Sequence, residues 1–161
     1  MSIAEDLAIL EQQEHVLRFA SFNAETAWQL GCILRDLLLD HRAGGTIEIE
    51  LADHLLFACV TPTATPGQAD WVRRKRNVVR RFGRSSYAIG LTLESNDETI
   101  ESRHCLDTED FAAHGGGFPI LLECTGPVGS VAVSGLPQRD DHNLVITALA
   151  KLLEKDVPRL S

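Results

Sequence analysis

The most regular hydrophobic pattern of the chain runs from Trp71 to Leu93 and predicts one long helix over about residues 66–94. Six arginines of this segment fall on a polar face. At about 100° per residue, the opposite arc collects apolar side chains, namely Trp71, Val72, Val78, Val79, Phe82, Ile89 and Leu93. Lys75 breaks the pattern because it lies inside this apolar arc. A buried ammonium is costly, so Lys75 must snorkel, pair with an anion or lose its proton.

The remaining patterns predict an α+β domain with helices before, between and after short strands. Helices are expected at residues 2–13, at 24–42 after a cap at Asn23, at 107–113 and at 139–155. Five strands are expected, at residues 15–20, 46–52, 55–60, 119–124 and 129–134. Apolar residues alternate with glutamates over residues 46–52, which indicates an antiparallel sheet. Residues 55–60 are apolar on both faces, which is typical of a central strand.

Size and composition indicate a single soluble domain, residues 1–161. The chain is 44% hydrophobic and 24% charged. No apolar run approaches the roughly 18 residues of a membrane span, and the N-terminus has no basic region ahead of an apolar stretch, as a secretory signal would. The cysteines are scattered and form no C-x-x-C pair, which fits reduced thiols: Cys32, Cys59, Cys105 and Cys124. We therefore expect a cytoplasmic protein without membrane partners.

Positive charge is concentrated in one segment. Residues 73–84 carry seven positive charges and no negative ones, which leaves −15 for the rest of the chain when this +7 is taken from the net charge of −8. The acidic remainder and the lack of interleaved aromatic residues argue against a nucleic-acid partner. We expect the basic stripe to pair with acidic surface of another subunit, in an oligomer interface formed by Trp71, Arg73, Arg74 and Arg76.

Three consecutive glycines, Gly115, Gly116 and Gly117, give a second signal. Their backbone N–H groups could approach an anion or a flat ligand closely, or the run could be a flexible turn before the next strand. The preceding residue is His114, and an H-G-G-G run supplies the oxyanion hole of some esterases. The chain lacks the G-x-S-x-G nucleophile motif of that class, which argues against a hydrolase.

Candidate metal ligands are sparse. His104 and His114 are the candidates for a metal or a haem iron, and scattered surface histidines are the alternative interpretation. Asp140 and Asp141, near the start of the last predicted helix, are expected to serve the helix dipole. The Ser134-Gly135 turn ahead of this helix is a weak candidate for backbone anion binding.

Four segments occur in an order that resembles the haem-degrading-domain family of the GlcG and HbpS type. They are W-V-R-R-K-R-N (71–77), R-F-G-R-S-S-Y (81–87), A-H-G-G-G-F-P-I (113–120) and V-A-V-S-G (131–135). The resemblance covers about residues 20–155 and is closest to the branch with the W-V-R-R-K signature. It implies a three-layer α/β/α domain with a mainly antiparallel, profilin-like sheet, and dimers that assemble further. It also implies haem as a candidate cofactor, because members bind or degrade haem.

Three functional hypotheses follow, and we rank an oligomeric small-ligand-binding domain first. Its pocket would contain Lys75, Ser86, His114 and the glycines 115–117, and its ligand would be anionic or planar, haem included. Ser86 joins this set because it shares the helical arc of Lys75. The second hypothesis is a haem-degrading enzyme in which His114 or His104 meets the iron. The third is a non-enzymatic assembly or adaptor protein.

Overall fold

A computed structural model describes residues 2–161 and arranges them around one antiparallel sheet. Its strands are β1 (Thr46–Leu51), β2 (His54–Val60), β3 (Gly117–Leu122) and β4 (Gly126–Ser134), in the spatial order β2-β1-β4-β3. Each neighbouring pair is antiparallel. The predicted α+β class and antiparallel sheet are therefore confirmed. The prediction of five strands is wrong, because the sheet has four.

The strand predicted near residues 15–20 is replaced by the end of a helix. α1 (Ile3–Val16) starts at a capping box formed by Ser2 and Glu5 and continues beyond the predicted end at Gln13. After it, Phe19 makes only an isolated parallel bridge to Leu122 of β3. Leu17 and Phe19 are nevertheless buried. Their apolar pattern thus reflects anchoring in the core and not a β-ladder.

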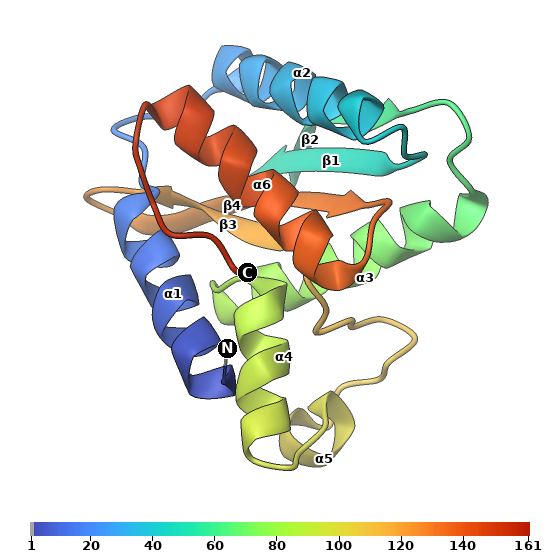
Figure 1. Cartoon of the computed structure of the whole chain (residues 1–161), viewed down its shortest axis with the longest axis vertical. Helices are drawn as coiled ribbons and strands as arrows, with labels where there is room; N and C mark the ends of the chain where they lie inside the picture. The colour runs from blue at the N-terminus through green and yellow to red at the C-terminus, as the bar shows by residue number, and fades with distance from the viewer. Residues whose placement is uncertain (1) are drawn as a thin grey trace.

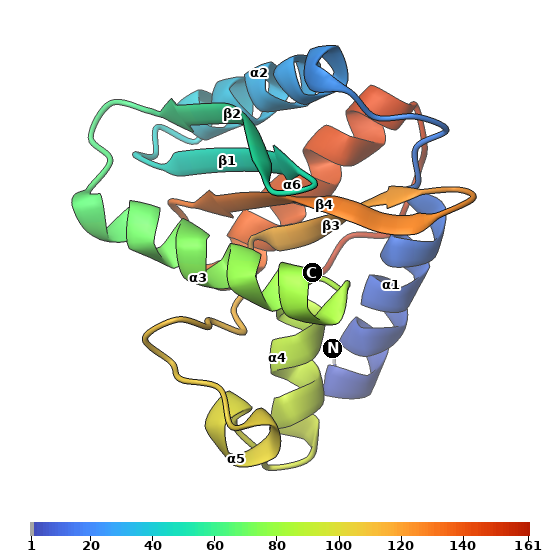
Figure 2. The same ribbon diagram turned by 180° about the vertical axis from the view of Figure 1, so that it is seen from behind.

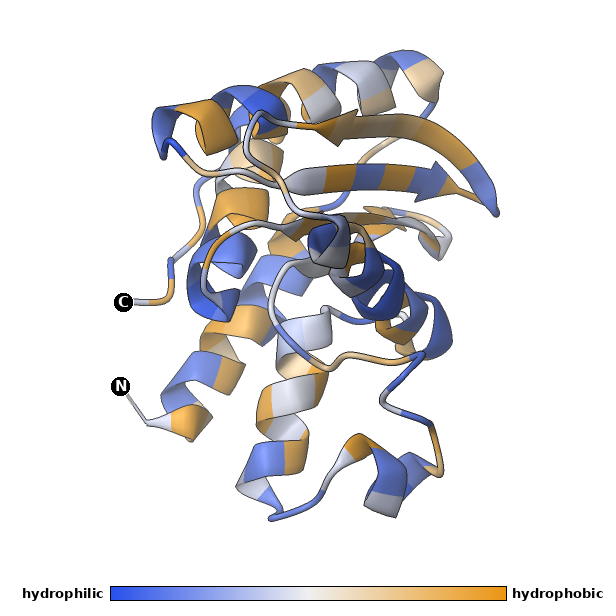
Figure 3. Cartoon of the chain, turned by 90° about the vertical axis from the view of Figure 1, so that its right-hand side faces the viewer, coloured by the Kyte–Doolittle hydropathy of each residue, from blue (hydrophilic) through white to orange (hydrophobic). Residues whose placement is uncertain are grey.

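Helices cover both faces of the sheet, as Figures 1 and 2 show from opposite sides. α2 (Ala24–Asp40) and α6 (Gln138–Leu153) lie on one face, and α3 (Pro66–Phe82) lies on the other. The predicted cap of α2 is confirmed, since Asn23 Oδ1 accepts a hydrogen bond of 3.0 Å from Thr26 N. Hydrophobic and hydrophilic residues alternate along β1, which is visible in Figure 3 as alternating colours.

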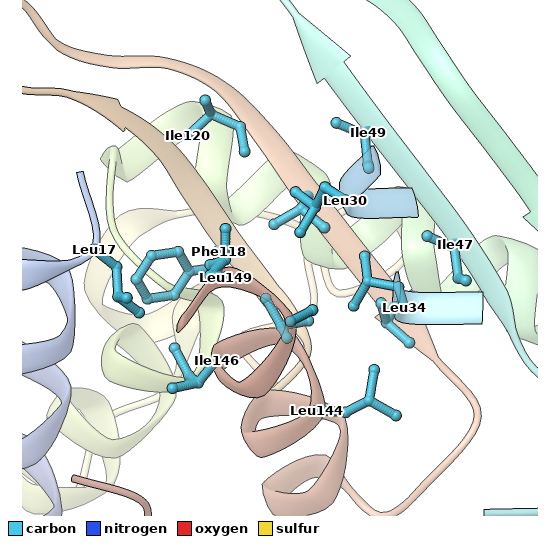
Figure 4. Packing of buried hydrophobic residues seen from close by; sticks show 14 of the residues in the cluster. Leu17, Leu30, Leu34, Ile47, Ile49, Phe118, Ile120, Leu144, Ile146 and Leu149 are labelled. Atoms are coloured by element: carbon cyan, nitrogen blue, oxygen red, sulfur yellow. The ribbon is translucent and has the colours of Figure 1, made fainter. Parts of the chain in front are cut away.

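The main core fills the layer between the sheet and α2 with α6. Ile47 and Ile49 of β1 belong to this core, whereas Glu48 and Glu50 meet Arg76 of α3. Figure 4 shows the aliphatic and aromatic side chains that the helices and strands contribute to the core, among them Leu30, Leu34, Phe118, Ile120, Ile146 and Leu149.

The long helix predicted over residues 66–94 is two helices. α3 ends at Phe82, and Gly83 follows in the left-handed conformation with φ of 65°. Ser85 then caps α4 (Ser86–Ser95) by accepting a hydrogen bond from Ala88 N at 3.2 Å. Ile89 and Leu93 of α4 still pack with Val78 of α3 in one small cluster. The apolar spacing therefore continues from α3 into α4, and for this reason the sequence pattern did not reveal the break between the two helices.

β2 was predicted to be central and is instead an edge strand. The central strands are β1 and β4. Phe57 of β2 is buried, with its ring 5.8 Å from that of Trp28 in α2, whereas Leu55 and Val60 are 53% and 65% exposed. An apolar run without charged residues thus forms a free sheet edge.

The segment between α4 and β3 also differs from the prediction. α5 (Ile100–His104) follows a capping box of Thr99 and Ser102, in a stretch that shows little periodicity. The helix predicted at residues 107–113 is a turn, in which Asp107 Oδ1 accepts a hydrogen bond from Glu109 N. Among residues 2–161, no helix is both long enough and apolar enough to cross a membrane.

Candidate functional site

Lys75 is buried, as the periodicity of α3 predicts, with 3% of its side chain exposed. Its Nζ donates to Asp141 Oδ2 at 2.8 Å and to the Val133 carbonyl oxygen at 3.0 Å. Asp141 comes from the first turns of α6 and is 1% exposed. Of the alternatives open to a lysine in an apolar stripe, the structure realises pairing with an anion.

Asp141 is the functional candidate that sequence reasoning missed. Its Oδ1 also accepts a hydrogen bond from Leu136 N at 2.9 Å, so the carboxylate holds the β4–α6 turn as well as Lys75. Asp141 does stand in the first turn of α6, where an acidic residue suits the helix dipole, and its contacts with Lys75 and Leu136 go beyond that expected role. Helical periodicity predicts its burial as it does for Lys75, because Asp141 lies one turn before the buried Val145 and two turns before the buried Ala148 on the same face of α6.

Burial and mutual attraction have opposite effects on the pKa values of Lys75 and Asp141. Burial lowers the pKa of Lys75, and attraction to Asp141 opposes that shift. Burial likewise raises the pKa of Asp141, and the lysine opposes it. Desolvation thus favours the uncharged form of both partners, and their attraction favours the charged form.

The glycine run is a tightly packed bend beside this pair. Gly116 has φ of 120°, and a Cβ added there would lie 2.4 Å from the Val133 carbonyl oxygen and 2.8 Å from Lys75 Nζ. A Cβ on Gly115 would lie 1.9 Å from the Gln138 carbonyl oxygen. Both glycines are therefore required for the backbone to approach α6 and Lys75 closely.

Ser86 supports this bend. Its Oγ donates to the His114 carbonyl oxygen and accepts from Gly117 N at 3.0 Å. Because α4 is separate from α3, the shared arc predicted for Ser86 and Lys75 does not exist. Ser86 does not line the cavity described next, and its contact with a ligand stays a prediction.

A cavity of about 480 Å³, called here the Lys75 cavity, opens between the start of α3, the His114 loop and the β4–α6 turn. Its lining combines the Lys75–Asp141 pair with mainly polar groups and two apolar side chains: Thr65, Gly67, Gln68, Trp71, His114, Ser134, Gly135, Leu136 and Gln138. The structure therefore brings together Lys75, His114 and the Ser134-Gly135 turn. The glycines 115–117 are not among the lining residues and pack beside them.

His114 is exposed at the mouth of this cavity, with its ring centroid 5.2 Å from that of Trp71. Partial desolvation, and then the positive charges of Lys75 and Arg74, lower the pKa of His114. Its imidazole is therefore neutral at neutral pH. His114 and Gln138 also line a second cavity of about 590 Å³, whose rim carries several carboxylates.

The other metal candidate lies elsewhere. His104 packs against Phe82 at a ring-centroid distance of 4.8 Å and lines neither cavity. In the described part of the chain, from Ser2 onward, no three His, Cys, Asp or Glu side chains are grouped to hold a metal ion.

Several basic residues of α3 have acidic partners within the chain. Arg73 pairs with Asp70 and Asp110, and Arg76 pairs with Glu48 and Glu50. The Arg74 guanidinium lies 4.5 Å from the centre of the Trp71 ring. An oligomer interface formed by these residues stays a prediction. Its arginines were expected to pair with acidic residues of a neighbouring subunit, but acidic residues of the same chain already pair with Arg73 and Arg76.

Comparison with known proteins supports the resemblance noted in the sequence. A family model described as "Haem degrading protein HbpS-like" matches residues 22–150. A UPF0303 protein of Rhizobium etli is 48% identical over 160 residues, covering 99% of this chain and 97% of the relative. One of Serratia proteamaculans is 48% identical over 158 residues, covering 98% of each.

Solved structures agree on the fold. The crystal structure of the Ybr137w protein superposes with a TM-score of 0.85 at 28% identity, covering 94% of this chain and 90% of the other. The PduOC:heme complex gives a TM-score of 0.68 at 15% identity, with 88% and 99% covered. The family match spans most of the chain and is supported by close relatives over nearly its full length, so the chain belongs to the HbpS-like family.

Proposed function

We propose that this protein is an oligomeric domain that binds a small planar or anionic molecule in the Lys75 cavity. The observation that carries the proposal is the buried Lys75–Asp141 pair at the wall of a cavity of about 480 Å³. A buried ion pair often stabilises a fold less than apolar residues of the same size would. A charged pair of this kind inside a cavity of ligand size is characteristic of binding sites.

The lining suggests how such a ligand would be held. The Trp71 ring offers a flat apolar surface, and Lys75 Nζ has one hydrogen beyond those donated to Asp141 and Val133. Asp141 already offsets the charge of Lys75. A ligand oxygen that accepts a hydrogen bond without a full charge, such as a carbonyl, therefore suits the pair at least as well as the carboxylate expected from the sequence.

Haem is the second candidate, favoured by the family and by the similar fold of the PduOC:heme complex. The neutral imidazole of His114 at the cavity mouth suits an iron ligand. The rest of the lining does not fit haem, because Trp71 and Leu136 are the only large apolar side chains against which a porphyrin face could pack. Haem degradation is therefore favoured by membership of the family alone.

Melting temperatures in the presence of a set of planar amides and carboxylates test the first candidate. We expect at least one compound to raise the melting temperature, and Trp71→Ala to abolish the rise. Trp28→Ala is the matched control, because Trp28 is exposed on α2, away from the cavity. No stabilisation by any compound, or equal loss in both variants, would contradict the proposal.

A haem titration followed by absorbance tests the second candidate. If haem binds through His114, the Soret band shifts in the wild type and in His104→Ala but not in His114→Ala. A shift that survives His114→Ala removes this residue as the ligand.

Self-association is the remaining part of the proposal. The free edge of β2 carries no charged residue, and the exposed Leu55, Val60 and Trp28 lie on or beside it. Unprotected edges of this kind readily pair with another chain. Light scattering can compare Leu55→Lys/Val60→Lys with Arg73→Glu/Arg76→Glu. Loss of particle mass in the first variant assigns the contact to β2, and loss in the second assigns it to the basic helix. A monomeric wild type would refute self-association.

A further inference from the structure

Lys75 is one of three lysines in the chain, and its environment differs from those of the other two. Lys151 is exposed on α6. Lys155 Nζ donates to the carbonyl oxygens of Val16 and Arg18, both at 2.9 Å, and ties the end of α6 to the end of α1. Among residues 2–161, Lys75 is the lysine that lines the Lys75 cavity and has a carboxylate at hydrogen-bond distance.

We propose that Lys75 forms a reversible Schiff base with a small aldehyde or ketone bound in the Lys75 cavity, and that Asp141 carries the proton. The inference rests on the proposed ligand-binding function and names the class of ligand: a small carbonyl compound with a flat apolar part that can lie against Trp71.

The first reason is that the pair can exchange a proton without changing its net charge. Lys75 Nζ and Asp141 Oδ2 are 2.8 Å apart, so one proton moved along this hydrogen bond converts ammonium and carboxylate into amine and carboxylic acid. Burial lowers the pKa of Lys75 and raises that of Asp141, and both shifts favour this uncharged form. The free amine is the nucleophile that a carbonyl compound requires.

The second reason is that the pair can perform both halves of the reaction. The amine attacks the carbonyl carbon and a C–N bond forms. Asp141 gives its proton to the carbonyl oxygen, which becomes a hydroxyl, and takes back the proton that the attacking nitrogen must lose, so the carboxyl group is again protonated. The protonated Asp141 then gives its proton to that hydroxyl, which leaves as water while the C=N bond forms. The product is a protonated Schiff base beside an ionised Asp141, so the buried positive charge keeps its partner.

The third reason is the fixed position of the amine. The Val133 carbonyl oxygen and Asp141 hold Nζ, and the bend at Gly116 closes over it from one side. Only a glycine fits there, because φ is 120° and a Cβ would lie 2.4 Å from the Val133 carbonyl oxygen. The lysine is thus held against the cavity instead of sampling many rotamers, which favours reaction with a bound molecule.

Reductive trapping tests the proposal without any substitution. The protein is incubated with benzaldehyde and sodium cyanoborohydride, and the label on each lysine is measured by peptide mass spectrometry. Burial alone predicts that Lys75 is protected relative to the exposed Lys151 in the folded protein. We expect the opposite, with Lys75 labelled faster than Lys151 by about tenfold or more when folded and at the same rate in urea. Folded protein that labels Lys151 first would overturn the proposal.

Variants at neighbouring positions test the role of the carboxyl group. Asp141→Asn keeps one acceptor oxygen for Lys75, loses the hydrogen bond from Leu136 N and cannot carry the proton, so trapping at Lys75 should slow by about 100-fold. Asp140→Asn is the matched control, because Asp140 is adjacent and exposed. Equal rates in both variants would remove Asp141 from the reaction. If Asp141→Asn does not fold, the labelling rates of Lys75 and Lys151 in the folded wild type and in urea still test whether Lys75 forms the Schiff base.

A separate measurement distinguishes the failure of this inference from failure of the proposed function. Benzyl alcohol has the ring of the probe without its carbonyl group. One outcome is that benzyl alcohol raises the melting temperature of the wild type but not of Trp71→Ala, while benzaldehyde leaves Lys75 unlabelled. In that case the cavity binds ligands and the Schiff base is refuted. If benzyl alcohol has no effect and Lys75 is unlabelled, both proposals fail.

Discussion

Lys75 and Asp141 are 66 positions apart in the chain and meet in an ion pair of 2.8 Å with almost no exposed surface. Lys75 comes from α3 on one face of the sheet, and Asp141 comes from α6 on the other. The pair therefore joins the two helical layers beside the end of β4, where Val133 accepts the second hydrogen bond of Lys75.

Removing one partner of this pair should be more damaging than removing both. Lys75→Met leaves Asp141 buried without a cation, so we expect a loss of about 3–5 kcal/mol in the free energy of unfolding. Lys75→Met/Asp141→Leu replaces both charges with apolar groups and should recover a large part of that loss. Urea unfolding measures both, with Lys151→Met as the exposed control. A double variant no more stable than the single one would show that the charges are not the cause.

The bend at the glycine run should tolerate no side chain at its centre. At Gly116, an added methyl group meets the Val133 carbonyl oxygen, and φ of 120° is unfavourable for any L-residue, so Gly116→Ala should lower the free energy of unfolding by about 2 kcal/mol or more. Gly67→Ala is the matched control, because nothing lies within 4 Å of the added Cβ in the first turn of α3. Similar melting temperatures for the two variants would contradict the assigned packing.

The sequence predicted those structural features that depend only on residues close together in the chain. The cap of α2 at Asn23 and the antiparallel pairing indicated by β1 are of this kind, and both are confirmed. The half-exposed strand that the alternation also predicted is wrong, because α3 covers the glutamate face and Glu50 is buried. The inward position of Lys75 also follows from the periodicity of α3 alone, because four of its neighbours on one face are apolar.

Features that depend on distant contacts could not be read in this way. Gly83 ends α3, but the apolar spacing resumes in α4 because both helices contribute to the same cluster. The position of β2 at the sheet edge depends on the pairing of β1 with β4, which local sequence does not specify. The partner of Lys75 was missed because Asp141 stands at a helix start, where an acidic residue has a ready local explanation.

Arg76 should stabilise the fold through contacts inside the chain. Its Nη1 donates to Glu48 at 2.5 Å and lies 3.0 Å from a carboxylate oxygen of Glu50, two acidic side chains on the same face of β1. Arg76→Met leaves them together without a cation, and we expect a loss of about 2 kcal/mol, less than for a fully buried pair because these groups retain some contact with water. The exposed Arg35–Asp36 pair is the control, and Arg35→Met should cost less than about 0.5 kcal/mol in urea unfolding. Equal losses of stability in Arg76→Met and Arg35→Met would mean that the contacts of Arg76 with Glu48 and Glu50 do not stabilise the fold.

Acid should destabilise the protein through His142 on α6. This side chain is fully buried, its Nε2 lies 2.8 Å from Gln13 Oε1, and its Nδ1 has no hydrogen-bond partner. Because Gln13 uses its own Nε2 to donate to the Pro158 carbonyl oxygen, its Oε1 faces His142 as an acceptor. Nε2 of His142 therefore carries a proton and donates a hydrogen bond to Gln13 Oε1. Burial lowers the pKa of His142 from 6.5 to about 3.

The sign of the effect follows from which state binds the proton. Between pH 6.5 and about 3, His142 is protonated in the unfolded chain and neutral in the folded one, so stability falls as the pH falls through this window. The slope from this one group approaches about 1.4 kcal/mol per pH unit. Urea unfolding between about pH 6.5 and 5, above the range where most carboxylates titrate, should show a flatter dependence for His142→Gln than for the wild type. His41→Gln, at an exposed histidine, is the matched control. A wild-type stability that is constant over this interval would mean that His142 can take up a proton without leaving the core.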